Sequence, residues 1–187
     1  MKTIKSLLLL SFLLMPFWSI AQPAELPNLN GFQDFALGTD KQQFGDRIQY
    51  LDSIEWEGIT DYNYVHHFTT SYEIAGIQFH DVLLTFNKSN KLKEIQLTRV
   101  YTEQLYPNHK IKFYQDHQKL YSYLNDLISR NGKRKNKFNS LNTFGYEWND
   151  GKTRLWSYLQ SSTTQENPIV KKAYFINLTW NYCKPFN

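Results

Sequence analysis

The chain contains a single cysteine, Cys183, although it is 187 residues long. One cysteine excludes an intrachain disulfide, so packing alone must stabilise the fold. Glycine-rich phosphate loops and the Gly-x-Ser-x-Gly motif of many hydrolases are also missing from the sequence. None of the five histidines belongs to a His-x-x-x-His or Cys/His pattern, so the sequence predicts no metal site and no cofactor.

Long apolar runs are missing too, except at the start of the chain. Residues 1–5 are positively charged, residues 6–20 are almost entirely apolar, and Ser19 and Ala21 are the small residues of a cleavage site. This is the layout of a secretory signal peptide. The apolar run is shorter than a membrane span of roughly 20 residues. We therefore expect residues 1–21 to be removed, and we expect no membrane span.

Removal of the signal would leave one domain in a periplasmic or secreted protein. Residues 22–30 are rich in proline and asparagine and predict a flexible leader. Residues 31–187 are long enough to enclose a core and predict a single domain. Because Gln22, and not a cysteine, follows the signal, we expect no lipid anchor.

A large excess of positive charge is also missing. The formal net charge is +4, and Lys2 and Lys5 would leave with the signal peptide, which lowers the charge to about +2. A nucleic-acid-binding domain would carry a larger basic excess on one face. We therefore expect no nucleic-acid partner.

What the chain does have is strand-like alternation of apolar and polar residues. Six segments show this period of two: residues 60–69, 73–86, 92–101, 144–148, 153–160 and 174–182. The Asn149–Gly151 segment predicts a hairpin turn between two of these strands.

Two helices are expected as well. Thr39 and Gln42 have the spacing of a capping box and predict a short helix. Residues 110–130 carry one apolar stripe and are followed by the stop signal Asn131-Gly132, so they predict a long amphipathic helix. The expected fold class is α+β: one antiparallel sheet of about six strands with helices on one face, built from two halves that each run helix, strand, strand, strand.

The opening Leu37-Gly38-Thr39, the three strands with an Asn/Lys turn and the amphipathic helix closed by Gly132 form a pattern with known counterparts. It resembles the exported domain of the lipoprotein of the outer-membrane barrel-assembly machinery. In doubled form it resembles the β-lactamase inhibitory protein. The resemblance implies a binding module that presents a sheet face or edge to a partner protein. The chain lacks the lipid-anchoring cysteine of the first and the paired cysteines of the second, so the resemblance names no partner.

Aromatic residues make up 17% of the chain and supply the best candidates for partner binding. Two sets each share one face of an expected strand: Tyr62, Tyr64 and His66, and Arg154, Trp156 and Tyr158. Tyr, Trp and Arg are enriched at interface hot spots. Since one face of each strand must build the core, we expect only one of the two sets to reach solvent.

A basic run begins at the end of the long helix with Arg130 and continues in what reads as a polar loop. Its residues are Arg130, Lys133, Arg134, Lys135 and Lys137. Such a run can attract the phosphate or sulfate groups of an anionic polysaccharide, or it can simply keep a surface loop solvated.

Three functional hypotheses follow from these observations. The first is an exported, non-enzymatic module that binds a protein in the cell envelope or outside the cell, as an inhibitor, an immunity-type factor or an envelope accessory protein. The alternative is a module that binds a polyanionic glycan through residues 130–137. The third is a hydrolase with an unrecognised site.

Overall fold

The computed structural model describes residues 27–56, 59–66, 72–129, 134–140, 143–166 and 169–183. Within these ranges, no helix combines the length and the hydropathy of a membrane span.

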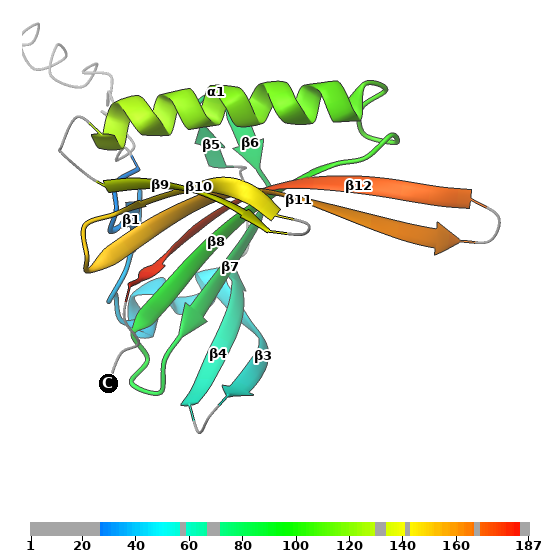
Figure 1. Ribbon diagram of the computed structural model, residues 1–187. Coiled ribbons are helices and arrows are strands. Elements are labelled where there is room, and N and C mark those ends of the chain that lie inside the picture. Colours follow the sequence, from blue (N-terminus) through cyan, green and yellow to red (C-terminus); the bar gives the residue numbers. More distant parts are fainter. Residues whose placement is uncertain are drawn as a thin grey trace, which may run out of the picture.

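Eight of the strands form one antiparallel sheet in the order β3-β4-β7-β8-β12-β11-β10-β9 (Figure 1). Their bounds are β3 Ile48–Trp56, β4 Ile59–His66, β7 Asp81–Phe86, β8 Leu92–Tyr101, β9 Arg134–Ser140, β10 Thr143–Asn149, β11 Thr153–Glu166 and β12 Ile169–Tyr182. The β11–β12 hairpin extends beyond its neighbours, since β8 pairs with β12 only as far as Tyr174 and β10 pairs with β11 only as far as Gln160.

The remaining elements form a second layer on one face of this sheet. They are β1 Gly31–Phe32, β2 Phe35–Ala36, the 3-10 helix η1 Lys41–Arg47, β5 Tyr72–Ile74, β6 Ile77–Phe79 and the helix α1 His109–Ser129. Figure 1 shows α1 lying along the sheet with β5 and β6 on the same side. We call the face that carries this layer the inner face and the opposite one the outer face.

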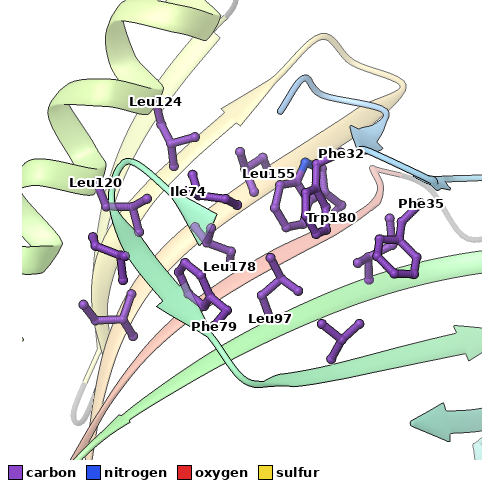
Figure 2. Packing of buried hydrophobic residues seen from close by; sticks show 14 of the residues in the cluster. Phe32, Phe35, Ile74, Phe79, Leu97, Leu120, Leu124, Leu155, Leu178 and Trp180 are labelled. Carbon is purple, nitrogen blue, oxygen red and sulfur yellow. The ribbon is translucent and has the colours of Figure 1, made fainter. Parts of the chain in front are cut away.

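Cross-strand pairing explains why the inner face holds the core. One row of paired residues crosses the sheet from β4 to β10, and all but its first member are fully buried: Tyr64, Leu84, Ile95, Trp180, Leu155 and Trp148. Side chains on one face of a sheet point the same way, so this row is a continuous apolar surface. Figure 2 shows Phe32 and Phe35 approaching it from the N-terminal segment.

The apolar stripe of α1 seals this core. Phe113, Leu120 and Leu124 are buried at helical spacing, which confirms the predicted stripe. In Figure 2, Leu120 and Leu124 point toward Ile74 and Leu155. The helix therefore rests on the inner face and partly on the β5–β6 hairpin.

The expected fold class is wrong. The described part of the chain is mostly β and has an eight-stranded sheet beside two small sheets. Only one α-helix and one 3-10 helix occur among the described residues, so the layout of helices on a six-stranded sheet and the two helix-first halves are not found.

Two strands of the eight-stranded sheet were not predicted, for different physical reasons. Residues 134–137 of the basic run, which were read as part of a polar loop, belong to the edge strand β9, and lysine is a common residue on exposed edges because it discourages further pairing. Strand β3 has a bulge between Tyr50 and Asp52, which shifts its register and hides the period of two.

The expected strand 73–86 is divided in three. The chain turns at Ala75 and Gly76, both with positive φ, so β5 and β6 form their own hairpin and β7 begins at Asp81. The predicted hairpin turn at Asn149–Gly151 is confirmed, because Asp150 Oδ1 accepts hydrogen bonds from the backbone N–H groups of Lys152 and Thr153.

Candidate functional site

The outer face carries a row of polar residues that crosses most of the sheet. One row of paired residues crosses seven strands, from β3 to β10: Asp52, Asn63, Thr85, Glu94, Asn181, Arg154 and Asn149. We call these residues the polar row. Each ring contact recorded between the second layer and the large sheet lies on the inner face, so no described residue of the second layer packs on the polar row through an aromatic ring.

Hydrogen bonds connect successive members of the polar row. Asn63 Nδ2 donates to Asp52 Oδ1 at 2.7 Å, and Thr85 Oγ1 donates to Asn63 Oδ1 at 2.8 Å. Asn63 and Thr85 are buried, so these bonds satisfy groups that have little access to water. The row is therefore held in place by its own contacts.

The other half of the polar row holds Arg154. Its Nε–H donates to Asn181 Oδ1 at 2.6 Å, and Asn181 Nδ2 donates to Glu94 Oε2 at 3.2 Å. The Arg154 guanidinium lies 4.4 Å from the centre of the Trp156 ring, a cation–π distance. Its remaining N–H donors form no hydrogen bond with the described residues. The side chain is therefore held in position and still has donors for a partner.

Contacts with two neighbouring residues also hold Trp156 in place. Its Nε1–H donates to Glu147 Oε2 at 2.6 Å, and Glu147 also accepts from Asn149. The Phe138 ring lies 6.0 Å from the Trp156 ring. Trp156 is half-buried, so part of its ring remains open to a partner.

Gly145 allows the strands that carry Trp156 and its neighbours to lie close together. It is paired with both Tyr158 and Phe138, and a Cβ at this position would lie 2.3 Å from the Ser157 carbonyl oxygen and 2.7 Å from Tyr158 Cα. These are backbone atoms that cannot move aside easily. The missing side chain therefore lets β10 and β11 approach closely beneath the aromatic residues.

Burial acts on the Glu94 carboxyl group in the polar row. It raises the pKa of Glu94, and the hydrogen bond from Asn181 opposes that shift only in part. Burial also raises the pKa of Tyr158, so its hydroxyl stays protonated at neutral pH.

Glu94→Gln is expected to stabilise the protein at neutral pH. The pKa of Glu94 is higher in the folded state than its ordinary value of 4.5. The contribution of this carboxyl to the free energy of unfolding is therefore complete below pH 4.5 and is lost as the pH rises through the pKa of the folded state. The glutamine cannot ionise and keeps an oxygen for Asn181. Urea unfolding should show that the free energy of unfolding of the variant exceeds that of the wild type by more at pH 7 than at pH 4. Glu73→Gln, at an exposed carboxyl, is the control, and an equal gain there would contradict the assignment.

The two aromatic sets predicted from the sequence lie on opposite faces. Arg154, Trp156 and Tyr158 are on the outer face, while Leu155 and Leu159 are buried beneath them.

The first set belongs to the inner face. The Tyr64 ring lies 5.3 Å from Phe86, and His66 lies 5.1 Å from Phe35. Tyr62 is paired with Phe86 on the same side. His66 therefore packs against the N-terminal layer, and Tyr62 and Tyr64 lie on the same face of the sheet.

The basic run does not form one patch. Lys135 donates to the Tyr121 hydroxyl at 2.6 Å and to Asn125 Oδ1 at 3.3 Å, so it is tied to α1. Lys137 lies over the Phe144 ring on the same side. Arg134 begins β9, whereas Arg130 and Lys133 lie outside the described residues.

Sequence reasoning missed several members of the outer-face group: Phe138, Glu147, Asn149, Glu94 and Asn181. The signal was present for Glu147, Asn149, Glu94 and Asn181, because these polar residues are adjacent to apolar residues of their own strands, whereas Phe138 stands between Lys137 and Asn139. What the sequence does not provide is the strand order that aligns them.

The described residues contain no group of three or more His, Cys, Asp or Glu side chains that could hold a metal ion. Comparison with family models, curated proteins and solved structures found no match. The chemistry that the outer face supports is recognition: hydrogen-bond donors and acceptors held in a row, beside a partly open tryptophan and a cationic guanidinium.

Proposed function

We propose that the protein is an exported, non-enzymatic module that binds a partner protein through the outer face of its sheet. The observation that carries the proposal is the Arg154–Trp156 pair. Both residues are held by hydrogen bonds to neighbouring strands, and Arg154 keeps donors that no described residue uses. Export is supported by the predicted signal peptide, residues 1–21, which lies outside the described residues.

Preorganisation favours binding at this pair. Ordering a long side chain on association costs about 0.5–1.5 kcal/mol, and here Asn181 and Glu147 already impose that order. Arginine and tryptophan are typical centres of interfaces, especially where weaker polar contacts surround them. The polar row would supply such contacts.

The size of the face also fits a protein. Eight strands at about 4.8 Å spacing span roughly 34 Å. A standard interface buries about 800 Å² on each partner, which such a face can provide. The free Arg154 donors suit a carboxylate or backbone carbonyl of the partner, and a carboxylate can be held by two parallel hydrogen bonds.

Quantitative capture from the envelope and culture fluid of the native organism tests the proposal. The wild type should retain one protein at about equal molar ratio, and Trp156→Ala and Arg154→Ala should each weaken its binding about 30-fold, the effect of a 2 kcal/mol hot spot. Gln118→Ala, on the exposed side of α1, is the matched control and should bind like the wild type. Circular dichroism confirms that each variant is folded. If the captured protein binds both outer-face variants as tightly as the wild type, or if no protein is captured at an equal molar ratio, the proposal is contradicted.

A further inference from the structure

A groove runs between α1 and the strands β10 and β11, on the opposite side of the sheet from the proposed interface. It consists of two adjoining cavities of about 480 Å³ and about 380 Å³. Both are lined by Tyr114, Phe144 and Leu159, so they are continuous at these residues. Cavities of this size hold small organic molecules.

The larger cavity is an aromatic chamber. Besides the shared residues, it is lined by Tyr121 and Tyr146, whose rings stack at 4.1 Å. His117 lines it as well, with its ring parallel to Tyr146 at 6.2 Å. Burial lowers the pKa of His117 to about 4, so the imidazole is neutral at physiological pH. His117 Nε2 has no hydrogen-bond partner among the described residues.

The smaller cavity is cationic. Lys110 comes from the first turn of α1 and Lys172 from β12, where it lies over the Tyr174 ring. Lys137 lies over the ring of Phe144, which lines both cavities, although Lys137 itself lines neither. No Asp or Glu lines either cavity, and none of these three lysines forms an ion pair in the part of the chain that the structure describes.

We propose that this groove binds an amphipathic organic anion, a carboxylate attached to an apolar chain or ring. The apolar part lies among the rings of the larger cavity, and the carboxylate lies toward Lys110 and Lys172. The division of the groove into an uncharged aromatic half and a half with unpaired cations is what selects this ligand class. This site is separate from the proposed protein interface and does not depend on it.

Decanoate is the probe, measured by isothermal titration calorimetry on the full mature chain below its micelle concentration. Decyltrimethylammonium, with the same chain and the opposite charge, is the matched control ligand. We expect saturable binding of decanoate at one site and at least tenfold weaker binding of the cation. Equal binding of both, or no binding of decanoate, would overturn the proposal.

Two variants separate the halves of the groove. Lys110→Gln combined with Lys172→Gln removes two exposed charges and should weaken decanoate binding about fivefold, as expected for two surface ion pairs. Ser122→Trp should fill the aromatic half and abolish binding, whereas Gln115→Trp, elsewhere on α1, should not.

Trp156→Ala should leave decanoate binding unchanged, so failure of this proposal is distinguishable from failure of the proposed function. Decanoate binding that is insensitive to both the double lysine variant and Ser122→Trp would place the ligand elsewhere and overturn the assignment.

Discussion

Trp180→Ala is expected to lower the free energy of unfolding by about 3–5 kcal/mol, the range for removing a buried tryptophan. Trp180 is fully buried at the centre of the inner face, where it pairs with Ile95 and Leu155. Its ring stacks on Phe32 at 5.4 Å, and its Nε1–H donates to the Asn28 carbonyl oxygen at 2.8 Å. The substitution would therefore leave a cavity and detach the N-terminal segment from the sheet. Urea unfolding followed by circular dichroism measures the loss.

Two further variants test the reason for this loss. Trp180→Phe keeps most of the ring contact with Phe32 but loses the hydrogen bond to Asn28, so it should cost less than Trp180→Ala. Trp156→Ala removes a half-buried tryptophan from the outer face and should also cost less. If Trp156→Ala destabilises the fold as much as Trp180→Ala does, the division into a core face and a recognition face is wrong.

Gly145→Ala is expected to lower the free energy of unfolding by about 3 kcal/mol, at the upper end of the usual overpacking range. The new Cβ would lie within 3 Å of the backbone of both Ser157 and Tyr158, so β10 and β11 must separate. Separation would also pull Glu147 away from Trp156 and disturb the outer-face group. The same urea titration measures this effect.

Thr143→Ala is the control for Gly145→Ala, because it lies two positions away on β10 and on the same face. It should change stability far less. A Gly145→Ala protein that unfolds at the same urea concentration as Thr143→Ala would show that the two strands have room to spare. It would then remove the explanation offered for the close approach of β10 and β11.

The elements with a strong local period could be predicted from the sequence. The stripe of α1 and the alternation in β8, β10 and β12 each follow from residues within one segment. Strand β3 could not be predicted in this way, because the bulge after Tyr50 interrupts its period. Strand β9 was hidden by its lysines, which suit a solvated loop and an exposed sheet edge equally well.

The candidate site was predicted in part for a related reason. Alternation in one strand shows that Arg154 and Trp156 share a face, but it does not tell which face is covered. The placement of α1, β5 and β6 decides that question, and it depends on contacts between segments far apart in the chain. Partners such as Asn181 become visible only when β12 is set between β8 and β11.

The resemblance to exported binding domains stays a prediction about function, since no comparison tests it. The contacts of the basic run could not be predicted from the sequence either. Lys135 reads as a free surface cation in the sequence, whereas in the structure it donates to Tyr121 and Asn125 of α1.

The most direct test of the central claim is site-specific photo-crosslinking in the native organism. A benzophenone side chain is placed at Gln96, on the outer face beside Thr179, or at Gln118 on α1. The account predicts a single protein adduct from position 96 that disappears when Arg154→Ala is added, and no such adduct from position 118. An adduct from position 118 alone, or one from position 96 that persists without Arg154, would contradict recognition through the outer face.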